Sequence, residues 1–123
     1  MIGYVTLGTQ DIKRAARFYD ELLAGLGGKR VMDFGTFIVW SRQPGAPGLA
    51  ITHPYDGKAA TVGNGVMVAL AAADKAQVDQ VYNKAIELGA TDEGKPGPRS
   101  ETFYAAYFRD LDGNKLNCFY MGR

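Results

Sequence analysis

The sequence YVTLGTQDIKRAARFYDELL, residues 4–23, recurs in altered form as MVALAAADKAQVDQVYNKAI, residues 67–86. Each copy begins with a short apolar run, continues with an aspartate, and then places apolar residues at helical spacing. The aspartates, Asp11 and Asp74, stand where a side chain caps the first turn of a helix. The repeat therefore predicts two related modules, each starting with a strand and a capped helix.

Strand-like runs follow both predicted helices. Because Gly94, Pro96, Gly97 and Pro98 disfavour a regular ladder, residues 90–102 are predicted to be mostly loop. Part of that loop, residues 94–102, is expected to act as a flap beside a binding cavity. The runs predicted as strands are 29–34, 36–41, 49–53, 103–109 and 115–120.

The predicted fold is α+β, with two paired βαβββ modules forming a curved mixed sheet around a cavity. A single module would leave one sheet face uncovered, so two modules are expected to pair. The chain is predicted to be one domain, with module one at 1–57, a linker at 58–64 and module two at 65–123.

Composition argues against several classes of protein. The net charge is +1 and no run of Lys or Arg exceeds two residues, so binding to nucleic acid is not expected. No terminal apolar stretch has the length of a signal peptide or a membrane span, and a cytoplasmic location is predicted. The single cysteine, Cys118, is predicted to be a buried, unreactive thiol.

The repeat, the segment PYDGKAATVGNG at 54–65 and the closing motif FYAAYFRDLDGNKLN at 103–117 together resemble the glyoxalase, bleomycin-resistance and dioxygenase superfamily, also called vicinal oxygen chelate proteins. The resemblance covers nearly the whole chain. It implies a small-molecule ligand and a homodimer. The superfamily contains lyases, isomerases, dioxygenases and drug-binding proteins, so the fold alone does not select an activity.

The resemblance also implies positions for metal ligands, which this chain fills with other residues. The two histidine positions are occupied by Tyr4 and Met67, and the closing glutamate position by Asn117. The fourth ligand belongs on strand 49–53, whose register the sequence leaves open. A phenol, a thioether and a neutral amide are poor ligands for a divalent ion at neutral pH. No metal and no cofactor is therefore predicted.

The remaining side chains favour a site for a small, uncharged or aromatic molecule in the cavity between the modules. Two of the candidates have plain structural alternatives: Trp40 fills core at least as readily, and His53 is favoured as a turn residue before Pro54. The predicted ligand-binding residues are Tyr4, Met67, Asn117, His53, Trp40 and Tyr107.

Two functional classes remain open from the sequence. The first is a metal-free binding protein. The second is a lyase, isomerase or dioxygenase-type enzyme whose metal ligands are atypical or lie elsewhere, or a metal-free enzyme using Tyr4 or His53 in acid–base chemistry. A calcium loop is excluded at DLDGN, residues 110–114, because its glycine is at the fourth position and Met121 stands at the twelfth.

Overall fold

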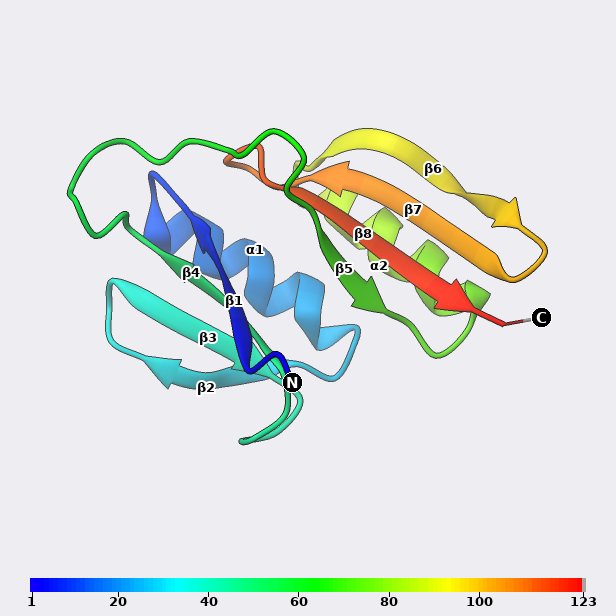
Figure 1. The fold of residues 1–123 in the computed structure, drawn as a ribbon, viewed down its shortest axis with the longest axis horizontal. Helices are drawn as coiled ribbons and strands as arrows, with labels where there is room; N and C mark the ends of the chain where they lie inside the picture. The colour runs from blue at the N-terminus through cyan, green and yellow to red at the C-terminus, as the bar shows by residue number, and fades with distance from the viewer. Residues whose placement is uncertain (123) are drawn as a thin grey trace. The chain divides into compact units, whose positions relative to one another are not determined.

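The computed structural model describes residues 1–122 and contains two helices and eight strands (Figure 1). The chain divides into two compact units, Met1–Gly63 and a second that begins at Asn64. The first contains β1 Tyr4–Gly8, α1 Ile12–Ala24, β2 Lys29–Asp33, β3 Phe37–Ser41 and β4 Gly48–Thr52. The second contains β5 Val68–Ala71, α2 Lys75–Glu87, β6 Thr91–Ser100, β7 Phe103–Arg109 and β8 Lys115–Met121.

Both units have the same topology. The sheet order is β1-β4-β3-β2 in the first and β5-β8-β7-β6 in the second. In each, the first strand pairs in parallel with the last, and the other neighbours are antiparallel. The predicted α+β fold of two βαβββ modules is confirmed, and each module has a four-stranded mixed sheet.

The two helices begin where the aspartates predict. Asp11 accepts a hydrogen bond from the backbone N–H of Arg14 at 3.1 Å, and Asp74 accepts one from Gln77 at 2.8 Å. Each bond satisfies a backbone donor that has no partner inside the first helical turn. The caps therefore fix where each helix begins.

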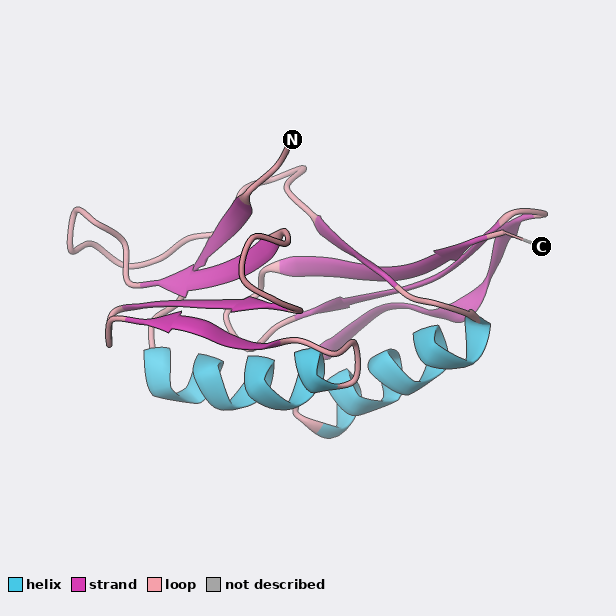
Figure 2. Cartoon of the chain, turned by 90° about the horizontal axis from the view of Figure 1, so that it is seen from below, coloured by secondary structure: helices cyan, strands magenta, loops and turns pink. Residues whose placement is uncertain are grey.

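Each helix covers one face of its own sheet (Figure 2). In the first module, Tyr19 of α1 packs on Trp40 of β3, with ring centroids 5.8 Å apart. In the second, Val78 and Val81 of α2 are buried, as is Phe108 of β7. The opposite face of each sheet has no helix of its own module, and we call it the helix-free face.

The segment predicted as a loop at 90–102 is instead a strand for most of its length. β6 spans Thr91–Ser100 and pairs with β7 alone, so it is an edge strand. Pro96 and Pro98 are tolerated because an edge strand has an outer side on which no ladder N–H is needed. The register shifts three times along this pair, which accommodates the glycines and prolines. The loop prediction was wrong, and the flap hypothesis loses its basis.

Neither helix within residues 1–122 combines the length and the apolar character needed to cross a bilayer.

Candidate functional site

Three strands of the second module place a row of side chains on its helix-free face. Asn117 of β8 lies opposite Ala69 of β5 on one side and Tyr107 of β7 on the other. Alternation along the strands puts these three residues on the face away from α2, because Cys118 and Phe108 point toward the helix and are fully buried. Met67 immediately precedes β5 and is 43% exposed. Two predicted site residues, Tyr107 and Asn117, are thus brought side by side.

Asn117 is the most unusual of these residues. Its side chain is 1% exposed, and its Nδ2 donates to the carbonyl oxygen of Ala106 at 3.3 Å. Within residues 1–122 no donor is bonded to its Oδ1. Oδ1 is not a fully buried atom, so water or a donor on a ligand can reach it. The oxygen therefore offers a hydrogen bond to a small molecule.

Tyr107 lies between two cations. The guanidinium carbon of Arg99 is 5.4 Å from the centroid of its ring, and Nζ of Lys115 is 5.6 Å from it. Both distances are within the range of a cation–π interaction. The wall around Tyr107 is therefore aromatic and positively charged.

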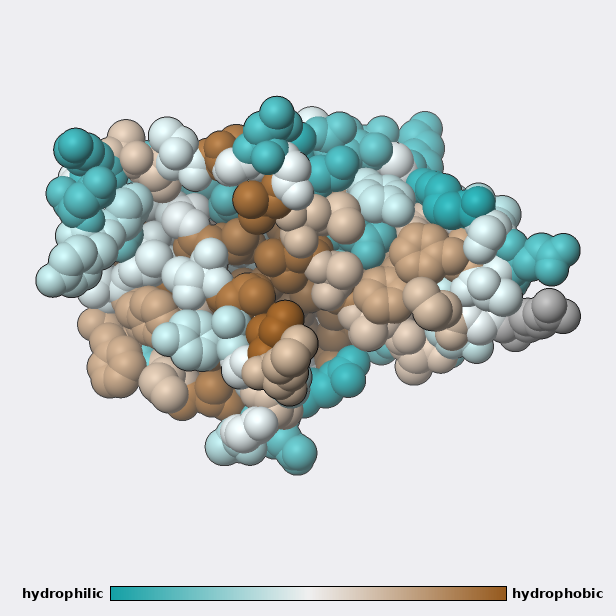
Figure 3. Space-filling model, viewed as in Figure 1, coloured by the Kyte–Doolittle hydropathy of each residue, from teal (hydrophilic) through white to brown (hydrophobic). Residues whose placement is uncertain are grey.

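In the first module, Tyr4 lies on the helix-free face. It is 59% exposed and meets Phe37 edge-to-face, with ring centroids 6.0 Å apart. The register of β1 with β4 pairs Thr6 with Ala50, so Ala50 is on the same face as Tyr4. The strand register that the sequence left open therefore offers an alanine at this position. Figure 3 shows apolar side chains exposed among polar ones.

Trp40 does not belong to this surface. It is 1% exposed, packs on Tyr19 of α1 and donates from Nε1 to Asp20 at 2.9 Å. The side chain points toward the helix because alternation along β3 sends residues 38 and 40 to that face. Within its module Trp40 is a core residue, and its assignment to a ligand-binding wall is corrected.

His53 follows β4 and lies exposed at a shallow groove in the first module. The groove has a volume of about 350 Å³ and is open to solvent. The backbone N–H of His53 donates to the carbonyl oxygen of Thr36 at 3.2 Å, and this bond fixes the turn before Pro54. The groove is lined by Thr9, Gln10, His53, Pro54, Gly57, Lys58 and Ala59.

The side chains at the implied ligand positions do not fit a divalent metal ion. Tyr4, Ala50, Met67 and Asn117 provide no imidazole, thiolate or carboxylate, which are the groups that hold zinc, nickel, manganese or iron. In the described part of the chain, no three His, Cys, Asp or Glu side chains lie close enough together to form a metal site.

The buried thiol predicted at Cys118 is confirmed. The side chain is fully buried, and desolvation raises the pKa of the thiol to about 12. A thiol with such a pKa stays protonated near neutral pH and is a poor nucleophile. Cys118 therefore contributes packing against α2 and no chemistry.

Comparison with known proteins agrees with this architecture. The model of the Glyoxalase/Bleomycin resistance protein/Dioxygenase superfamily matches residues 1–118, and the chain belongs to this superfamily. No curated protein matches the sequence.

Solved structures extend the comparison. A glyoxalase/bleomycin resistance protein from Albidiferax ferrireducens T118 is 35% identical, with 97% of each chain covered and a TM-score of 0.89. A hypothetical protein from S. aureus is 27% identical, covering 98% of this chain and 92% of that one, with a TM-score of 0.74. A lactoylglutathione lyase from Agrobacterium tumefaciens, 22% identical with 97% and 92% covered and a TM-score of 0.68, shares the fold.

Sequence reasoning missed Arg99 and Lys115 as parts of the site. Lys115 stands within the closing motif at 103–117 but was given no role there, and Arg99 lay in a segment interpreted as loop. Only the pairing of β6 and β8 with β7 brings both side chains to Tyr107.

Proposed function

We propose that the chain is a metal-free binding protein of the glyoxalase superfamily that takes a small molecule with an aromatic part on the helix-free face of its second module. The observation that carries the proposal is Asn117, whose Oδ1 is unused although the side chain is 1% exposed. A ligand N–H or O–H supplies the missing donor.

Two neighbours of Asn117 support the same conclusion. Tyr107 offers the edge of an aromatic ring against which a flat molecule can pack, and Met67 offers an adaptable thioether. Apolar walls with a small number of placed polar groups are typical of small-molecule sites. We keep Tyr4 and His53 as separate proposed ligand contacts, each on the first module alone and outside this site.

The test is a titration of isotope-labelled protein with 2-naphthamide, an uncharged aromatic molecule carrying an N–H donor. We expect backbone amide shifts at residues 67, 107 and 117. Replacing Asn117 by leucine should weaken binding by roughly fivefold to tenfold, since one hydrogen bond to the amide oxygen is lost. The matched control is Asn83→Leu on the exposed face of α2, which should leave binding unchanged.

The metal-free part of the proposal has a separate test. Elemental analysis of the purified protein should find no stoichiometric divalent metal, and a chelator should leave its melting temperature unchanged. Retention of one metal ion per chain through dialysis would contradict the proposal and favour the metalloenzyme alternative.

The alternative of a lyase or isomerase rests on a different observation, the exposed imidazole of His53 beside the groove of about 350 Å³. An imidazole is the side chain best suited to proton transfer near neutral pH. If the groove is catalytic, His53→Gln should abolish turnover of a small carbonyl substrate while leaving 2-naphthamide binding intact.

A further inference from the structure

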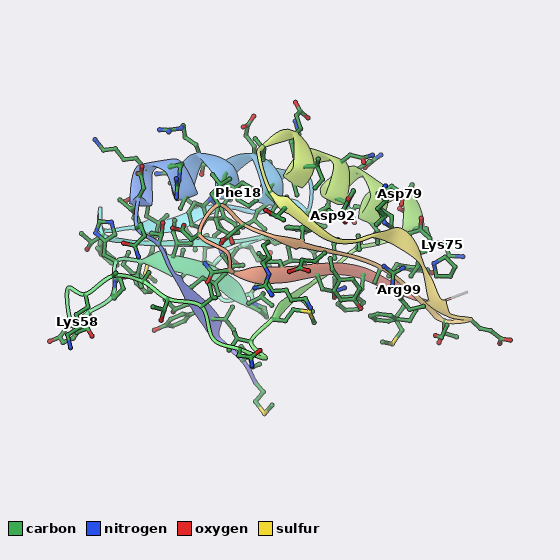
Figure 4. All side chains as sticks on the ribbon, turned by 90° about the horizontal axis from the view of Figure 1, so that it is seen from above. Phe18, Lys58, Lys75, Asp79, Asp92 and Arg99 are labelled. Atoms are coloured by element: carbon green, nitrogen blue, oxygen red, sulfur yellow. The ribbon has the colours of Figure 1, made fainter. Side chains whose placement is uncertain are left out.

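Arg99 is held in place by its own strand. Its Nη1 donates to the carbonyl oxygen of Gly97 and its Nη2 to that of Lys95, both at 2.8 Å. Figure 4 shows Arg99 on the other side of β6 from α2, where Asp79 lies. The guanidinium therefore stands on the helix-free face, against the ring of Tyr107.

Two glycines make room for this arrangement. A Cβ at Gly94 would lie 3.2 Å from Nη2 of Arg99, and a Cβ at Gly97 would lie 3.3 Å from Nη1. Both distances are tighter than an ordinary van der Waals contact. The absence of side chains at these two positions leaves room for the guanidinium beside the backbone of β6 and the ring of Tyr107.

Lys115 brings a second positive charge to the same ring from β8. It lies two residues before Asn117, so the two side chains share the helix-free face. Within residues 1–122, neither Arg99 nor Lys115 forms an ion pair. Arg109, the partner of Lys115 across the sheet, is instead neutralised by Glu93.

Arg99 and Lys115 are two cations without acidic partners, and Arg99 is fixed by backbone carbonyls. The pair therefore lacks a neutralising anion. A guanidinium presents N–H groups in a planar fork that matches a carboxylate. Because Arg99 is already ordered, little conformational entropy remains to be lost when an anion binds. The cations lie over the faces of the Tyr107 ring, and its edge is left to meet the flat part of the same molecule.

We propose that the natural ligand is a small aromatic acid, whose carboxylate is bound by Arg99 and Lys115 while its ring packs against the edge of the Tyr107 ring. This inference rests on the proposed function and narrows its ligand from an aromatic molecule in general to an anionic one. Asn117 then accepts a hydrogen bond from a donor on the ring.

The experiment compares 2-naphthoate with 2-naphthamide, two probes of nearly equal shape that differ in charge. Binding of each is measured by amide shift titration at low ionic strength and again in 0.5 M salt. We expect 2-naphthoate to bind more tightly, and its affinity alone to fall with salt, because salt screens the attraction between charges.

Charge-removing variants locate the interaction. Arg99→Gln and Lys115→Gln should each weaken the binding of 2-naphthoate roughly threefold to tenfold. The affinity for 2-naphthamide should stay within about twofold of its value in the unmodified protein. The matched controls are Arg17→Gln and Lys13→Gln, which remove the same charges from the exposed surface of α1 and should change neither affinity. A loss in the controls equal to that in the site variants would show a net-charge effect and overturn the proposal.

Gly97→Ala tests whether binding depends on the position of the Arg99 guanidinium as well as on its charge. The added methyl group would lie 3.3 Å from Nη1 and shift the guanidinium by a few tenths of an ångström without changing any charge, so binding of 2-naphthoate should weaken slightly while that of 2-naphthamide does not. Equal affinity for both probes in the unmodified protein would overturn this inference and leave the proposed function standing. Failure of both probes to bind would refute the proposed function and the inference with it.

Discussion

Asp110 shows how a residue of a ligand-like motif can serve a turn. Its Oδ1 accepts hydrogen bonds from the backbone N–H groups of Asp112 and Asn114, both at 2.9 Å, and its Oδ2 accepts one from the Asn114 side chain at 3.0 Å. Gly113 takes a positive φ of 90° to close the reversal. The resemblance of DLDGN to a calcium loop reflects this turn chemistry.

Replacing Asp110 by alanine should therefore destabilise the protein by about 2–3 kcal/mol, because buried donors lose their acceptor. Urea unfolding monitored by circular dichroism gives the free energy of unfolding. Glu21→Ala on the exposed side of α1 is the control and should change it by less than about 0.5 kcal/mol. A small effect at Asp110 would mean that water replaces the carboxylate.

The carboxylate of Asp20 on α1 binds side chains of β2 and β3. It accepts hydrogen bonds from Nε and Nη2 of Arg30 at 2.9 and 2.7 Å and from Nε1 of Trp40 at 2.9 Å. The hydrogen bonds from Arg30 hold the pKa of the Asp20 carboxyl below its usual value. A carboxyl whose pKa is lower in the folded state stabilises the fold above its unfolded pKa of about 3.9, and the contribution is lost as the pH falls through the folded pKa.

Asp20→Asn should consequently lower the free energy of unfolding by about 1 kcal/mol at neutral pH. The effect is small because the Asp20 side chain is 41% exposed. The difference between variant and unmodified protein should shrink toward about pH 2. Fluorescence of Trp40, the single tryptophan, reports unfolding at each pH. A pH-independent difference would show that the asparagine disturbs packing and not charge.

At the scale of elements, β6 departs most from expectation. Its glycines and prolines are unsuited to a central strand, yet it has one neighbour only and bends through three register shifts. Tyr82 of α2 also holds β6 against the helix, because its hydroxyl donates a hydrogen bond to Oδ1 of Asp92 at 2.8 Å. An edge position relaxes the requirement that every residue offer an N–H to the ladder.

Hydrogen exchange tests this assignment. Peptides covering 91–100 should exchange more slowly than peptides covering 55–63, which contain no helix or strand. Exchange of the two segments at the same rate would restore the interpretation of residues 94–102 as a mobile flap.

For the whole molecule, the superfamily resemblance predicts a homodimer, and we retain that as a proposal. Sedimentation equilibrium at micromolar concentration should give twice the chain mass of 13.3 kDa. The mass should remain unchanged when 2-naphthoate is added, because the proposed site uses residues of one module. A single species of 13.3 kDa would refute the dimer.

The sequence alone was sufficient for the modules, because their signals are local. Apolar spacing along each helix and the capping aspartates act over a few residues, the repeat shows the same local pattern twice, and each was confirmed in the fold. The buried state of Cys118 followed in the same way from its place in an apolar strand.

Tertiary structure decided what each side chain meets. Trp40 faces α1, β6 is an edge strand, Asn117 keeps an unused oxygen, and Arg99 lies against Tyr107 between two glycines. Each of these depends on which strands pair and in what register, and a shift of one residue would send every side chain to the other face. Strand pairing joins residues far apart in the chain, so no local pattern contains it.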